Sequence, residues 1–150
     1  MGYTRYWRSR DTRIDPITGS DKFSADFVEE VKKIVAIADS DFGIKLGDGW
    51  GEGKPVISEN LIELNGREDL DEDCESFVLE ASSEGCKFQF CKTERLPYDS
   101  VVLAVLRLAR DYGYVQKISS DGPNKQSKAN ALYHVADGRY DKLKTEQKEL

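Results

Sequence analysis

The stretch that most constrains the fold is residues 86–113, where an apolar segment runs into a polar corner and then into an apolar helix. Residues 92–95 form the corner, and Pro97 follows, in a position that suits the first turn of a helix. Over residues 101–109 only Arg107 is polar, which predicts a helix buried on most sides. Ligands often bind where a strand ends and a helix begins, because the first amides of the helix lack partners and carry partial positive charge. The corner is therefore a candidate site.

Size and composition narrow the class of protein. The chain has 150 residues, 33% charged and 39% hydrophobic, which is typical of one ordinary globular domain. The net charge of −6 disfavours general nucleic-acid binding, for which a basic domain is expected. No apolar run approaches the ~20 residues of a bilayer span, and the first ten residues have no apolar stretch typical of a secretory signal. The three cysteines include no C-x-x-C pair. We therefore expect a cytoplasmic protein with no membrane partner, no metal and no cofactor.

Local patterns predict the secondary structure. Ser24 is suited to cap a helix over residues 25–39, whose apolar residues recur at helical spacing. Strands are expected at residues 2–10, 44–46, 61–64, 76–81, 86–93 and 114–118. The strands at 76–81 and 86–93 are predicted to form a hairpin across a turn at 82–85.

The order of these elements predicts the architecture. It favours a single α+β domain over residues 1–123, with a mostly antiparallel sheet and two main helices packed on one face. Residues 124–150 form a polar C-terminal segment, for which we expect a short helix near residues 129–135 and then a frayed tail.

The sequence matches few of the familiar catalytic and metal-binding motifs. His134 is the only histidine and lies in the polar C-terminal segment, which disfavours a Ser-His-Asp site or a histidine metal centre. The glycine-rich residues 47–53 match neither phosphate-binding fingerprint, and residues 67–75 lack the glycine of a calcium loop. Hydrolysis by paired carboxylates stays open, because 28 acidic residues offer many pairs.

A set of cationic, aromatic and hydroxyl side chains from three segments remains as the candidate site. Arginine and lysine suit phosphate or carboxylate groups, and aromatic rings offer flat faces to a base or a sugar. The predicted ligand-binding residues are Arg5, Trp7, Arg8, Lys92, Thr93, Arg95, Ser119, Ser120 and Asp121. Together they predict a pocket for a nucleotide-like anion, provided that the first strand approaches the corner. The ordinary alternatives are that Trp7 is a core residue and that Lys92 and Arg95 pair with nearby acids.

The same segments resemble a family of small bacterial and phage proteins. The segments that carry the resemblance are GYTRYW at residues 2–7, FCKT at 90–93 with PYD at 97–99, and SSDG at 119–122. The resemblance spans roughly residues 2–122. Members typically open with G-Y-T-x-Y-W, often with histidine at the position of Arg5, so histidine-dependent chemistry is not expected here. The resemblance implies no catalytic residue.

Three functional hypotheses follow. The leading one is a protein that binds a small anionic, nucleotide-derived ligand. Since similar proteins occur in phages, one version sequesters a host immune signal in the host cytoplasm without cleaving it.

The enzymatic alternative is a nucleotide hydrolase or lyase in which Asp121, Glu94 or Asp99 acts as acid or base beside Lys92. The third is a protein-interaction module whose acidic residues 59–84, ten acids against one arginine, contact a basic partner. A pocket completed by a second copy of the chain, in a homo-oligomer, is compatible with the first hypothesis.

Overall fold

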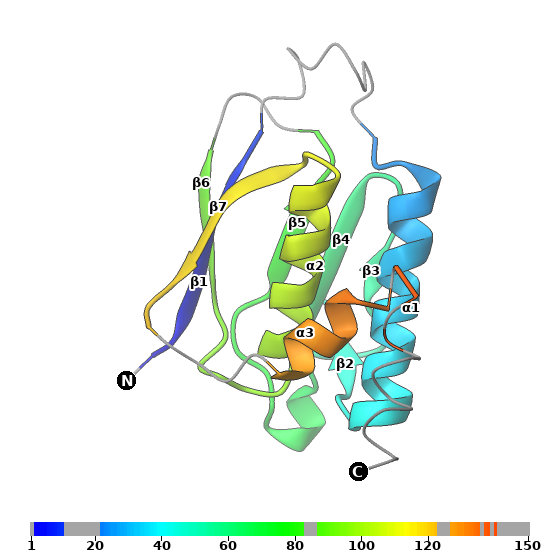
Figure 1. Ribbon diagram of the computed structural model, residues 1–150. Coiled ribbons are helices and arrows are strands. Elements are labelled where there is room, and N and C mark those ends of the chain that lie inside the picture. Colours follow the sequence, from blue (N-terminus) through cyan, green and yellow to red (C-terminus); the bar gives the residue numbers. More distant parts are fainter. Residues whose placement is uncertain are drawn as a thin grey trace.

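A computed structural model of the chain describes residues 2–10, 22–82, 87–122, 127–135, 137–138 and 140. Within these residues seven strands form two antiparallel sheets (Figure 1). The first sheet has the order β6–β1–β7 and consists of β1 (Thr4–Ser9), β6 (Phe88–Lys92) and β7 (Val115–Ser120). The second is built around β4 (Leu61–Gly66), which pairs with β2 (Leu46–Gly47), β3 (Val56–Ile57) and β5 (Phe77–Glu80). The α+β prediction is confirmed, with the sheet divided in two.

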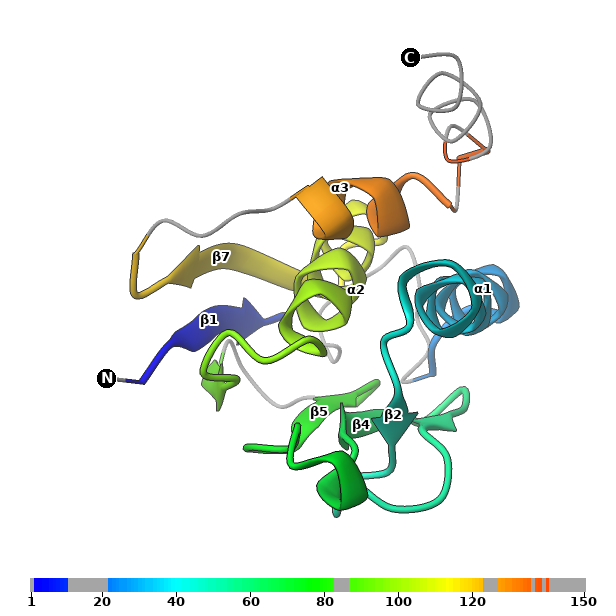
Figure 2. The same cartoon turned by 90° about the horizontal axis from the view of Figure 1, so that it is seen from below.

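Among the described residues there are three α-helices. They are α1 (Ala25–Phe42), α2 (Asp99–Asp111) and α3 (Ser127–Tyr133), and a short 3-10 helix, η1 (Glu68–Leu70), follows β4. Of the three, α1 and α2 lie against the sheets. Seen from below, α2 lies in the angle between the two sheets, and α1 and α3 pack against it (Figure 2). The short C-terminal helix is therefore present, and its packing makes it part of the same core.

The ends of α1 show why its sequence forms a helix. The Ser24 hydroxyl accepts a hydrogen bond from the Phe27 amide at 3.2 Å, as its sequence position predicts. At the other end Gly43 has a φ of 64°, in the left-handed region that glycine adopts readily. The helix therefore runs to Phe42, beyond the predicted end at residue 39.

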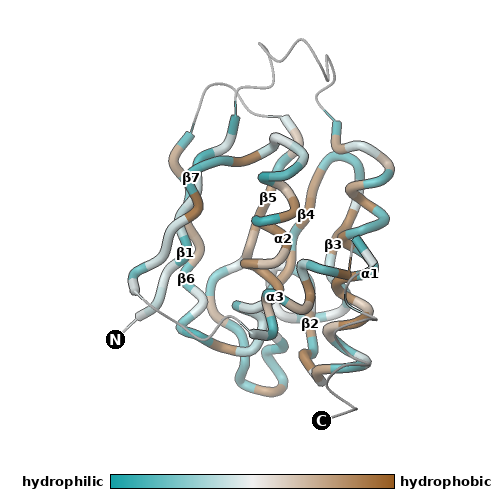
Figure 3. Tube along the Cα trace, viewed as in Figure 1, coloured by the Kyte–Doolittle hydropathy of each residue, from teal (hydrophilic) through white to brown (hydrophobic). Residues whose placement is uncertain are grey.

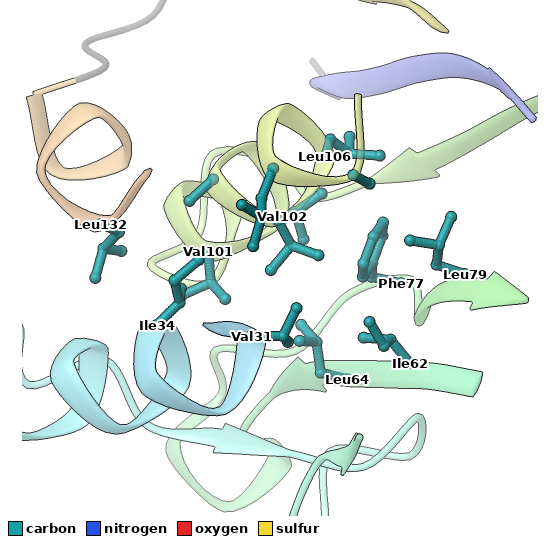
Figure 4. Close-up of a cluster of buried hydrophobic side chains, with 14 of the residues drawn as sticks. Val31, Ile34, Ile62, Leu64, Phe77, Leu79, Val101, Val102, Leu106 and Leu132 are labelled. Atoms are coloured by element: carbon teal, nitrogen blue, oxygen red, sulfur yellow. The ribbon is translucent and has the colours of Figure 1, made fainter. Parts of the chain in front are cut away.

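The core lies between α2 and the inner faces of the sheets. Hydrophobic residues concentrate on α2, β4 and β5 in the tube view (Figure 3). The close-up shows them meeting side by side (Figure 4): Val31 and Ile34 of α1, Ile62 and Leu64 of β4, Phe77 and Leu79 of β5, Val101, Val102 and Leu106 of α2, and Leu132 of α3. Burial of α2 on most sides is what its nearly uniform apolar sequence predicts.

The predicted hairpin between residues 76–81 and 86–93 is wrong. The two strands are consecutive in the chain, yet β5 pairs with β4 and β6 pairs with β1. Just before β5 begins, the Glu75 amide donates to the Lys92 carbonyl at 3.1 Å. Burial of apolar side chains decides the pairing instead of the local turn. Phe77 and Leu79 of β5 pack into the core, and β6 completes a different sheet, whose inner face buries Trp7.

Some predictions fall outside the described residues. These are most of the turn at 82–85, the domain boundary after residue 123, and the tail from residue 141 onward. Among the residues that are described, no helix is both long enough and apolar enough to cross a bilayer.

Candidate functional site

Strand β1 is the centre of the predicted site, and it lies between the other two segments. Arg5 stands opposite Cys91 of β6 on one side and opposite Ser120 of β7 on the other. Thr4 stands opposite Lys92, so the start of the chain and the polar corner are adjacent in space. The pleat of β1 then divides the predicted residues between two faces, because alternate side chains point to opposite sides.

The inner face holds a buried ion pair. The Arg5 guanidinium donates from Nε to Asp99 Oδ1 at 3.0 Å and from Nη2 to Oδ2 at 2.8 Å. The Thr93 hydroxyl donates to Asp99 Oδ1 at 2.7 Å. Arg5 is 2% exposed, Asp99 3% and Thr93 0%. This two-pronged, hydrogen-bonded contact ties the first residue of α2 to the middle of β1. Arg5 and Thr93 are therefore buried on the inner face, where both bind Asp99.

Trp7 also lies on the inner face, as a core residue. Its ring is 1% exposed and lies 5.5 Å from that of Phe77, centroid to centroid. Its indole N–H donates to the Gln89 side-chain oxygen at 3.0 Å. Because Gln89 satisfies the one polar atom of the indole, the ring is buried at little cost.

The polar corner is a tight turn with two residues in the left-handed region. Glu94 has a φ of 53° and Arg95 a φ of 60°, and the Leu96 amide donates to the Thr93 carbonyl at 3.0 Å. Residues other than glycine adopt this region at a cost, so the corner stores strain. The turn places the Arg95 guanidinium 4.4 Å from the Tyr3 ring, in a cation–π contact.

Asp121 fastens the end of β7 to β1. Its carboxylate accepts from the Thr4 amide at 3.0 Å and from the Tyr6 hydroxyl. The hydrogen bond to Asp121 is the main cause that raises the pKa of Tyr6 above its ordinary value. The Ser120 hydroxyl donates to the Gly122 carbonyl at 3.1 Å, while Ser119 is exposed opposite Tyr6.

The outer face of β1 and β6 carries exposed aromatic rings that the sequence prediction missed. Phe88 is 54% exposed and Phe90 58%. Tyr6 stacks on Phe88 with ring centroids 5.8 Å apart and planes at 22°, and the Arg8 guanidinium lies 5.8 Å from the Phe88 ring. Lys92 follows two residues after Phe90 on the same face. We call Tyr6, Arg8, Phe88, Phe90 and Lys92 the outer aromatic face. The sequence shows only that Phe88 and Phe90 are two residues apart and so share a face, and the register with Tyr6 and Arg8 makes that face the outer one.

Two hollows lie on either side of Phe90. The first, of about 430 Å³, is the Trp50 hollow, and its lining includes Trp50, Asn65, Asp73, Glu75 and Phe90. The second, of about 380 Å³, is the β5–β6 hollow, lined by Trp7, Ser76, Val78, Glu80, Phe88, Gln89 and Phe90. Trp50 is 80% exposed at the tip of the glycine-rich loop.

Asn65 holds the walls of the Trp50 hollow together. Its side-chain amide donates to the carbonyls of Gly49 at 3.2 Å and Cys74 at 3.0 Å, and its oxygen accepts from the Cys74 amide at 3.1 Å. At the next position, Gly66, a side chain would place its first carbon 1.9 Å from the Glu72 carbonyl oxygen. Only glycine permits this close passage of the two backbones.

Of the two described cysteines, Cys91 is buried and Cys74 is partly buried. Cys91 is 1% exposed, and burial raises the pKa of its thiol to about 12, which keeps it in the unreactive protonated form. Within the described ranges no three histidine, cysteine or acidic side chains are grouped to hold a metal ion.

No protein-family model, curated protein or solved structure matches this chain.

Proposed function

We propose that the protein binds a small anionic ligand with a planar ring system, of the nucleotide-derived kind, on the outer aromatic face. The observation that carries this proposal is the stacked pair of Tyr6 and Phe88 with Arg8 beside it, on a sheet face that none of the described helices covers. A base stacks on such rings, and each base–aromatic contact contributes about 1–3 kcal/mol. An exposed apolar patch of this kind on a protein surface commonly marks a binding site.

The cations of this face would contact the anionic part of the ligand. Arg8 and Lys92 flank the rings, and the Lys92 side chain is 44% exposed beside Glu94 at 3.3 Å. A guanidinium or ammonium group binds phosphate or carboxylate oxygens. Ser119, exposed opposite Tyr6, adds a hydroxyl at the border of the face. The net charge of −6 favours a small anion over a polyanion, which the acidic remainder of the surface would repel.

Calorimetry tests the proposal with a panel of mononucleotides, cyclic nucleotides and ADP-ribose compounds. We expect at least one to bind below about 100 µM, and Phe88→Ala to weaken it by about fivefold to a hundredfold, as loss of one stacking contact requires. The matched control is Leu70→Ala, which truncates a side chain of similar exposure (50%) in η1. The proposal fails if no compound binds, or if both variants bind like the unaltered protein.

The fate of the bound ligand separates sequestration from turnover. Of the acids considered for catalysis, Asp99 is buried and bonded to Arg5 and Thr93, which leaves Asp121 and Glu94 beside the outer aromatic face. Chromatography of the ligand after incubation and denaturation is the measurement. Intact ligand supports sequestration, as expected for an immune signal held without cleavage, whereas a shortened product supports the hydrolase or lyase alternative.

A further inference from the structure

Within the described residues, the facing edges of β5 and β6 have backbone hydrogen-bonding groups that are not paired in either sheet. Two hydrogen bonds show which residue pairs of β1 and β6 are bonded to each other. The Ser9 amide donates to the Lys87 carbonyl, and the Thr93 amide donates to the Tyr3 carbonyl. In an antiparallel pair the bonded residues alternate, so the amides and carbonyls of Phe88 and Phe90 point away from β1.

The same reasoning applies to β5. The Ala81 amide donates to the Asn60 carbonyl at 3.0 Å, so the backbone groups of Val78 and Glu80 point away from β4 and toward β6. Among the described residues, the backbone groups of β5 and β6 are not paired with each other. Beyond Phe90 the β6 edge is closed, because the Lys92 amide donates to Glu75 Oε1 at 2.6 Å and its carbonyl accepts from the Glu75 amide.

The β5–β6 hollow occupies this open interval. Its volume is about 380 Å³, and its walls are apolar at Phe88, Phe90 and Val78 and acidic at Glu80. An exposed strand edge next to apolar side chains is the arrangement to which extended peptides add as a further strand. The main chain of such a peptide pairs with the edge, and its alternate side chains fill neighbouring hollows.

The adjoining Trp50 hollow indicates the chemistry of one such side chain. Trp50 and Phe90 supply aromatic surfaces, and Asp73 and Glu75 supply carboxylates. Aromatic faces beside carboxylates attract an alkylammonium or guanidinium group. The linings of the two hollows contain three acids, Asp73, Glu75 and Glu80, and no lysine or arginine. Their charge is therefore complementary to a basic peptide.

We propose that a partner protein adds an extended basic segment to the edge of β6 at Phe88–Phe90, with a lysine or arginine side chain in the Trp50 hollow. This proposal does not rest on the ligand proposed above. It depends on the backbone edge, Trp50 and Glu80, whereas ligand binding depends on Arg8 and Lys92. The rings of Phe88 and Phe90 are common to both, and for that reason they are left unchanged in the test.

The probe is a capped octapeptide that alternates lysine and valine, titrated into the full-length protein by calorimetry. We expect saturable binding below about 1 mM, with slower amide hydrogen exchange at Phe88 and Phe90 in the complex. A copy of the peptide with an N-methyl group on every amide has no backbone donor to offer a strand edge, and we expect it not to bind. A glutamate–valine octapeptide tests the sign of the charge and is expected not to bind.

Variants of the protein locate the peptide. Trp50→Ala and Glu80→Lys are each expected to weaken binding about tenfold, the usual size for loss of one strong contact. Glu29→Lys on the outside of α1 reverses an exposed charge remote from the edge and is expected to leave binding within twofold. The proposal is overturned by absence of binding, by equal binding of the N-methylated peptide, or by equal effects of the Glu80 and Glu29 reversals.

Discussion

The inner and outer faces of β1 carry similar residues in different surroundings. On the inner face Arg5 is buried, and both prongs of its guanidinium meet the carboxylate of Asp99. On the outer face Arg8, three positions later, is exposed and lies over the ring of Phe88. The comparison teaches that the pleat decides whether an arginine of this strand is buried in the core or exposed on the surface.

Replacing each arginine in turn is the most direct test of this difference between the two faces of β1. Arg5→Ala removes the cation that faces the buried Asp99 carboxylate, and we expect it to lower the free energy of unfolding by about 3–5 kcal/mol. Arg8→Ala removes an exposed cation and is expected to change stability by about 0.5 kcal/mol or less. Urea denaturation measures both. If both variants lowered the free energy of unfolding equally, the buried ion pair would stabilise the fold no more than the exposed arginine does.

The thiol of Cys91 tests how well the inner face excludes solvent. Its raised pKa, about 12, together with its burial, predicts that alkylation at pH 8 is slower than in the urea-unfolded chain by at least about tenfold. Because the folded pKa exceeds the unfolded one, the associated stability is fully present below about pH 9 and is lost as the pH rises toward 12.

Mass spectrometry of the alkylated peptides measures the rate at each cysteine separately. Cys91→Ala should show a smaller loss of stability between pH 9 and 12 than the unaltered protein, because the titrating thiol is gone. Rapid labelling of Cys91 in the folded chain would contradict a closed inner face.

A smaller effect than the loss of Arg5 concerns the turn that joins β6 to α2. Glu94→Gly replaces a side chain at a φ of 53° with a residue that adopts this region freely. We expect a gain in stability of about 0.5–1 kcal/mol, seen as a higher melting temperature. The matched control, Glu68→Gly in η1, lies outside the left-handed region and should give no gain.

The predictable part of the fold rests on local chemistry. Ser24 and the apolar spacing after it predict α1, and the run of apolar residues after Pro97 predicts α2. The candidate site required the first strand to approach the polar corner, and in the structure Thr4 stands opposite Lys92. Each of these signals lies within a short segment of sequence.

The unpredictable part depends on contacts between distant segments. In the segment FQFC, hydrophobicity alone would place Phe88 and Phe90 inside and Gln89 outside. The reverse holds because Gln89 accepts the indole hydrogen bond of Trp7, and Cys91 faces the core. The choice of face is set by the register with β1, and nothing within the four residues specifies it.

The strand order of the first sheet has a consequence for the growing chain. β1 is made first, yet its partners are β6 and β7, and Arg5 stands opposite Ser120. On the ribosome β1 therefore waits, unpaired, until residues 88–120 have been synthesised. Its aromatic residues are exposed to other chains during this interval, so the yield of folded protein should depend on how quickly residues 88–120 emerge.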